Sequence, residues 1–227
     1  MEAISDNLGD YFQGFGYTIA LFVVAGILSM IGGTILCALR VGPVAIMRSA
    51  AATYVTVVRN TPLVVVFAFF SFAAPLFGLT FSFLDVHIGD FDFTRTFGAG
   101  VISLTLYTST FVCEALRSGI NAVPVGQAEA ARAIGLTFGG TMTQVVLPQA
   151  FRASVPPLAS VQIALLKNTS VAAAFGIAEA VAQMRLLTNN FSSQRTEIFL
   201  AFALGYVVLV LILSFGASRL ERRWRLA

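Results

Sequence analysis

The feature that most constrains this chain is the run of residues 17–39, which contains no charged residue. A helix needs about 20 apolar residues to cross the hydrocarbon core of a bilayer, so this run is long enough to span a membrane. Hydrophobic residues make up 57% of the 227 positions and charged residues 11%, against about 25% charged in soluble domains. The sequence therefore predicts an all-α integral membrane protein of about five spans, in a single transmembrane domain over residues 1–227.

The later apolar runs predict the remaining spans. They are residues 63–83, 97–120, 153–180 and 197–217. Pro75 and Gly78 allow a bend in the second span, while Pro156, Pro157 and Gly176 are expected to break the fourth span near both ends. Residues 45–58, which precede Pro62, are predicted to form an interfacial or membrane-entering helix.

The arginines predict the orientation of the chain. Segments 40–60, 121–152 and 218–227 hold nine arginines, whereas segments 1–16, 84–96 and 181–197 hold three. By the positive-inside rule, the N-terminus is expected outside, and the central segment 121–152 and the C-terminus in the cytosol. Residues 1–16 contain no Lys or Arg, so a cleavable signal is not expected and the first span is expected to be retained.

Within the central segment 121–152, residues 126–148 are the longest stretch that is not expected to enter the membrane. Pro124 suits the first turn of a short helix, and Gly135 can end that helix in the left-handed conformation. Thr137 can then cap a second helix, and Pro148 is not expected to continue it.

Small residues in this segment recur at helical spacing. Ala128, Ala131 and Gly135 would form one stripe, on which another helix could pack closely. From the residues alone, an ordinary solvated helical hairpin explains the segment equally well.

Several charged residues lie inside predicted spans. Glu114 and Arg117 are three residues apart on a helix and are predicted to pair. Lys167 lies near the centre of the fourth span, where an isolated cation costs about 3 kcal/mol or more unless it faces a partner or water. We expect Lys167 to face either a translocation path or a buried acid.

No motif for catalysis or nucleotide binding occurs in the sequence. GxxxxGK[ST], HExxH and GxSxG are absent, so the chain is not expected to be an enzyme or to bind ATP itself. Cys37 and Cys113 lie in apolar runs without a CxxC motif, and they are expected to act as small hydrophobic residues, with no metal site. The arginines are scattered, which argues against nucleic acid as a partner.

The chain resembles the permeases of bacterial ABC importers for polar amino acids, across residues 54–180. The matching motifs, in order, are Arg59-Asn60-Thr61-Pro62-Leu63, Glu114-Ala115-Leu116-Arg117-Ser118-Gly119-Ile120, Gly126-Gln127, Glu129-Ala130-Ala131 with Gly135, Leu147-Pro148-Gln149-Ala150, and Lys167-Asn168-Thr169-Ser170. The resemblance implies the type I importer permease fold, with an EAA loop at about residues 121–152 that docks as a coupling helix on an ATPase.

By this resemblance, coupling is carried by Glu129, Ala130, Ala131, Gly135 and Pro148. The small residues would allow close approach, and Glu129 would make a charged contact. The implied partners are a dimer of ATPase subunits that bind ATP-Mg, a second permease subunit (self or paralogue), an extracytoplasmic amino-acid-binding protein and membrane lipid. No cofactor is expected in this chain, which would be a multi-pass protein of the bacterial cytoplasmic membrane.

Polar residues of the spans are candidates for the substrate path. They are Lys167, Asn168, Thr169, Ser170, Glu114, Arg117, Arg59 and Thr61. A purely structural polar network between helices is the alternative, and it weighs more for the three charged residues that lie near predicted cytosolic ends: Glu114, Arg117 and Arg59.

Three departures from the commoner family pattern bear on the substrate. They are Asn60, the run Tyr107 to Thr110, and Asn168. This set is most similar to the glutamate-importer permeases of actinobacteria, which implies glutamate as the substrate. Two alternatives come from other classes: a self-sufficient secondary transporter or channel with Lys167 and Glu114 as ion-coupled sites, and a scaffold subunit without a transport path.

Overall fold

The computed structural model describes residues 2–81, 85–89 and 91–224, almost all of them in helices. The predicted end of the second span at residue 83, and Arg225, lie outside these residues. The helices are α1 (Glu2–Ser5), α2 (Leu8–Val41), α3 (Ala45–Asn60), α4 (Leu63–Ala68), α5 (Arg95–Asn121), α6 (Val125–Ala133), α7 (Phe138–Thr141), α8 (Leu147–Asn168), α9 (Ala180–Asn190) and α10 (Arg195–Trp224). Shorter helical turns cover Phe69–Ala73, Ala74–Phe77, Met142–Val146, Thr169–Phe175 and Ser192–Gln194.

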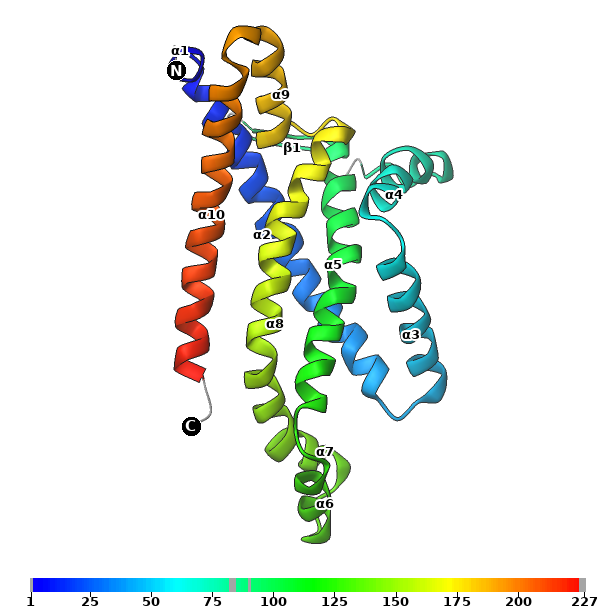
Figure 1. Ribbon diagram of the computed structural model, residues 1–227. Coiled ribbons are helices and arrows are strands. Elements are labelled where there is room, and N and C mark those ends of the chain that lie inside the picture. Colours follow the sequence, from blue (N-terminus) through cyan, green and yellow to red (C-terminus); the bar gives the residue numbers. More distant parts are fainter. Residues whose placement is uncertain (1, 82–84, 90, 225–227) are drawn as a thin grey trace.

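Four helical runs among the described residues are long and apolar enough to cross a membrane. They are Leu8–Val41, Arg95–Asn121, Phe138–Phe175 and Ser192–Arg222. These runs confirm the first, third, fourth and fifth predicted spans. Helix α5 lies in the middle of the bundle, α2 crosses it at a tilt, α8 lies beside it, and α10 stands at the edge (Figure 1).

The core lies where α2, α5 and α8 meet. Leu21, Leu104 and Leu165, one from each helix, are fully buried. Glycine allows the helices to approach: a Cβ atom at Gly33 would lie 2.4 Å from the side chain of Val112, so any side chain there would push α2 away from α5.

The predicted second span, residues 63–83, does not form a span by itself among the described residues. Its helical part, Leu63–Phe77, is bent by 103° against α3, and the two together form the only candidate for a fifth crossing among the described residues. Thr61, which precedes Pro62, is extended (φ −92°, ψ 129°) and interrupts the helix. The run ends at Gly78, which has φ +83°.

The predicted breaks at Pro148, Pro156 and Pro157 are also wrong, because residues 138–175 form one continuous helical run. A π-helical turn, Met142–Val146, precedes Pro148, and the N–H of Leu147 donates to the carbonyl of Met142. This wider turn accommodates a proline ring that an α-helical turn would exclude. The predicted break at Gly176, with φ +81°, is confirmed.

The two ends of the bundle differ in structure. One end carries α1, α9 and an antiparallel hairpin that the sequence did not predict, β1 (Val86–Ile88) with β2 (Phe91–Phe93); the other carries α6 and α7 (Figure 1). The arginine-poor segments lie at the hairpin end. Which end faces the cytosol stays a prediction.

Candidate functional site

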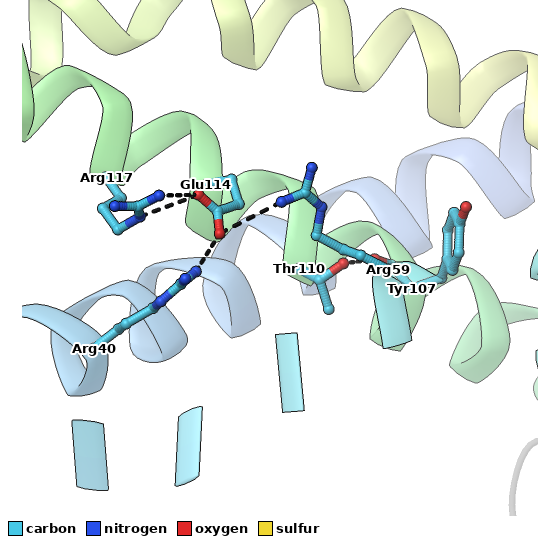
Figure 2. A network of polar contacts seen from close by, with 6 residues as sticks. All are labelled: Arg40, Arg59, Tyr107, Thr110, Glu114 and Arg117. Carbon is cyan, nitrogen blue, oxygen red and sulfur yellow. Dashed lines mark hydrogen bonds and ion pairs between the residues drawn. The ribbon is translucent and has the colours of Figure 1, made fainter. Parts of the chain in front are cut away.

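A cluster of charged side chains joins three helices around Glu114 of α5 (Figure 2). Arg117 donates from Nη2 (2.8 Å) and Nε (3.1 Å) to Oε2 of Glu114, which confirms the predicted pair. Arg40, from the end of α2, donates to Oε1, and Arg59 of α3 lies with Nη1 3.4 Å from the same oxygen. The cluster sets three positive charges against one negative charge.

The cluster leaves Glu114 no free oxygen for a ligand. Its side chain is 19% exposed and that of Arg40 is 18% exposed. The carboxylate therefore links α2, α3 and α5 through ion pairs. Arg59 is the most accessible member at 41%. It lies in the last turn of α3, in the same cluster as Glu114 and Arg117, and its expected place near a cytosolic end stays a prediction. Its guanidinium group lies 5.2 Å from the ring centre of Phe111.

Two cavities meet at Phe111, and we call them together the Phe111 groove. The smaller, about 240 Å³, is lined by Val55, Thr56, Arg59, Asn60, Phe111 and Glu114. The larger, about 360 Å³, is lined by Tyr107, Thr108, Phe111, Ser160, Val161, Ala164, Leu165 and Asn168. The groove therefore contains members of all three departures from the family pattern, which come from α3, α5 and α8.

Lys167 and Ser170 do not line this groove. They face a third cavity of about 460 Å³ between α8 and α10, together with Val181, Tyr206, Val207, Val210 and Leu211. The candidates Lys167 to Ser170 therefore do not share one cavity, because successive helical residues point in different directions. Thr169 and Thr61 line none of these cavities: their hydroxyl groups donate to the carbonyls of Leu166 (2.7 Å) and Val57 (2.9 Å).

A buried carboxyl that the sequence analysis missed lies close to the Lys167 cavity. Glu179 is fully buried and accepts hydrogen bonds from the hydroxyl of Tyr206 (2.8 Å), the hydroxyl of Thr18 (3.4 Å) and the N–H of Ala182 (3.0 Å). Burial raises the pKa of Glu179, although these hydrogen bonds oppose the shift. The sequence signal was an acid directly before a helix in an apolar stretch.

Lys167 forms no ion pair with any described residue, so the expectation of a directly facing acid is not met. Tyr206, which lines the same cavity as Lys167, donates a hydrogen bond to the buried acid Glu179.

The α6–α7 segment has the predicted local structure. Pro124 directly precedes α6, Gly135 has φ +93°, and the N–H of Leu136 donates to the carbonyl of Ala131 (3.1 Å). The hydroxyl of Thr137 accepts from the N–H of Gly140 at 3.2 Å, so it caps α7 as predicted.

The surface of this segment differs from the predicted stripe. Glu129, Ala130, Gly135 and Pro148 are exposed, but Ala131 is only 5% exposed and packs inside the α6–α7 segment. The expected contact of Ala131 with a partner is therefore wrong for the chain as folded. Three large apolar side chains that the sequence analysis missed form an exposed apolar tip: Val125 (72%), Ile134 (81%) and Phe138 (59%).

Comparisons with known proteins agree on one family. Residues 29–226 match the family model described as the binding-protein-dependent transport system inner membrane component. The glutamate transport system permease protein GluC of Corynebacterium glutamicum is 42% identical over 225 residues, 98% of each chain. The glutamate/aspartate import permease protein GltJ of Escherichia coli K12 is 33% identical over 225 residues, which cover 96% of this chain and 89% of GltJ.

Solved structures share the fold. A chain from a structure described as an amino acid ABC transporter with histidines superposes with a TM-score of 0.84 at 27% identity, covering 97% of this chain and 96% of the other. The inward-facing methionine transporter MetNI superposes with a TM-score of 0.73 at 19% identity, covering 97% and 99%, a likeness of fold alone.

Proposed function

The chain belongs to the family of binding-protein-dependent transport system inner membrane components, and from that premise we propose that it carries glutamate across the bacterial cytoplasmic membrane. It is a multi-pass permease subunit of an ABC importer for amino acids and not an enzyme, and ATP is hydrolysed by a partner ATPase. This assignment replaces the alternatives of a self-sufficient secondary transporter or channel and of a scaffold subunit.

The main evidence for glutamate as the substrate is the charge of the Phe111 groove. Glu114 is the only acid that lines the groove among the described residues, and arginines occupy both of its oxygens. Arg59 contributes an accessible positive charge, and Asn168, Tyr107 and Ser160 contribute neutral hydrogen-bonding groups. A groove whose single acid is paired, next to a cluster of three arginines and one glutamate, favours an anionic amino acid. The name of the relative GluC points the same way.

The substrate is tested by placing a carboxylate in the groove. Asn168→Asp changes little in volume, but it adds a negative charge that would repel a glutamate side chain. We expect the KM for labelled glutamate to rise in proteoliposomes with the complete transporter, and glutamine to compete better than it does in wild type. Asn121→Asp, at the exposed end of α5, is the matched control. Unchanged KM and competition in Asn168→Asp would reject the groove as the substrate site.

The continuous run 138–175 supports a route for coupling. We propose that Glu129, Ala130 and the apolar tip contact the ATPase. Ala131 supports them from inside the α6–α7 segment. Gly135 allows the chain to turn after α6. Pro148 lies in the first turn of α8, the helix that also contains Ser160 and Asn168. Closure of the ATPases would move α6 and α7 and shift α8 against α5, which opens the groove to the other side.

The proposed assembly contains two ATPase subunits that bind ATP-Mg, a second permease subunit that is either a copy of this chain or a paralogue, and an extracytoplasmic amino-acid-binding protein. Segment 121–152 faces the cytosol in this arrangement. The hairpin end, with α9 and the arginine-poor segments, faces outward, where the binding protein docks.

A further inference from the structure

The chain contains only two cysteines, and the fold brings them together. Cys37 of α2 is 4% exposed and Cys113 of α5 is fully buried, in one apolar cluster with Val55. The two side chains therefore pack in the same buried cluster at the interface of α2 and α5. Small hydrophobic side chains at both positions would fill this space, so contact between the only two thiols calls for a chemical explanation.

Helix packing on either side holds the two thiols in place. One turn before Cys37, Gly33 packs directly on Val112 and on the carbonyl of Ser109. One turn after Cys37, Arg40 contacts Glu114. Helices α2 and α5 therefore lie side by side through this stretch, with little freedom for the thiols to separate.

A positive charge lies beside the pair, since the guanidinium group of Arg40 contacts Glu114, the residue next to Cys113. The thiolate is the reactive form of cysteine, and a neighbouring cation balances the negative charge that develops on it during a reaction. Two neighbouring thiols can be oxidised to a disulfide through a sulfenic acid.

We propose that Cys37 and Cys113 form a redox modification site, at which a hydroperoxide converts the two thiols into an intrachain disulfide. The thiolate of Cys113 attacks one peroxide oxygen, the O–O bond breaks, and a sulfenic acid and water form. The thiol of Cys37 then attacks that sulfur, the S–S bond forms, and the S–O bond breaks as a second water leaves. Overall, two thiols and hydrogen peroxide give one disulfide and two waters.

The disulfide would fix α2 to α5 next to the Glu114 cluster. If transport requires these helices to shift, as the proposed function implies, the oxidised chain transports more slowly and a dithiol reductant restores the rate. This consequence rests on the proposed function, whereas formation of the disulfide does not.

Counting thiols tests the site directly. The purified transporter is treated with hydrogen peroxide, denatured without reductant, and labelled with maleimide-polyethylene glycol, so that each thiol shifts this chain once on a gel. We expect two additions in the untreated wild-type chain, none after peroxide, and two again after dithiothreitol. Cys37→Ser and Cys113→Ser are the matched controls, and each keeps its single addition after the same treatment.

Three results of the labelling experiment would overturn the site: two additions to the wild-type chain after peroxide, loss of the single thiol from both control variants, or a chain of doubled mass before reduction. Uptake assays on the same samples test the consequence. Peroxide should inhibit the wild-type transporter reversibly and leave Cys37→Ser active. A disulfide without inhibition would reject the regulatory role. If even the untreated transporter shows no uptake, the proposed function fails, while the label count still decides the thiol pair.

Discussion

Lys167 and Asn168 are consecutive in the sequence, yet their side chains line separate cavities. Asn168 lies in the Phe111 groove with Tyr107 and Ser160, while Lys167 faces α10 and Tyr206. A helix turns by about 100° per residue, so these two polar side chains lie on different faces of α8. The separation allows the two surfaces to be tested by substitutions at neighbouring positions.

Asn168→Ala should weaken transport through substrate binding, because it removes hydrogen-bonding groups from the groove. We expect the KM for glutamate to rise about fivefold, which corresponds to one hydrogen bond of about 1 kcal/mol. Lys167→Met, of similar volume, should leave the KM unchanged. Uptake kinetics with the reconstituted transporter measure both, and an equal rise in KM for Lys167→Met would show that the lysine also contacts substrate.

Glu114→Gln should destabilise the chain, because Arg40, Arg59 and Arg117 would lose their shared counter-charge. Breaking a buried ion pair costs about 3 kcal/mol, and the partial exposure of Arg59 and Arg117 reduces this to about 1–3 kcal/mol here. Thermal unfolding in detergent measures the loss. Glu129→Gln, at an exposed position, is the control, and equal melting temperatures for the two variants would contradict a structural role for the cluster.

Gly135→Val should reduce binding of the ATPase, since Gly135 has φ +93° and a β-branched residue is strained there by about 1–3 kcal/mol. Space is not the obstacle, because a Cβ atom added at this glycine would meet no neighbouring group within 4 Å. Gly139→Val is the matched control: it is equally open but has no positive φ. Recovery of the ATPase with the tagged permease measures the effect, and equal recovery for both variants would argue against the turn at Gly135 as a coupling feature.

Glu179→Gln should flatten the dependence of stability on pH. The raised pKa means that the folded chain keeps the proton at pH values where the unfolded chain has lost it. The stability that Glu179 contributes is therefore complete below the ordinary carboxyl pKa of 4.5 and is lost as the pH rises through the raised pKa of the folded protein.

The measurement is the melting temperature of the purified chain across this pH range. Wild type should lose stability with rising pH more steeply than Glu179→Gln. Parallel curves for wild type and Glu179→Gln would show that the buried carboxyl does not titrate as described.

The sequence was sufficient for features that depend on local patterns. Apolar runs of span length predicted four of the crossings, and helical spacing predicted the pair of Glu114 with Arg117. The turn at Gly135 followed from backbone preference.

Features that depend on contacts between distant segments were not predictable in this way. Arg40 and Arg59 reach Glu114 from two other helices, and Glu179 meets Thr18 and Tyr206 only in the folded chain. The burial of Ala131 depends on how α6 packs on the helical turn before α8. Pro148 misled the sequence analysis because the π-helical turn that accommodates it leaves no clear signature in residue types.

Accumulation of labelled glutamate in proteoliposomes tests the central claim most directly. The vesicles contain this permease, its ATPase and its second permease subunit, with the binding protein on the side of the hairpin and ATP-Mg on the side of α6 and α7. The account predicts that glutamate accumulates against its gradient only when ATP is hydrolysed and the binding protein is present. Accumulation by the permease without the ATPase, driven by an ion gradient alone, would contradict it.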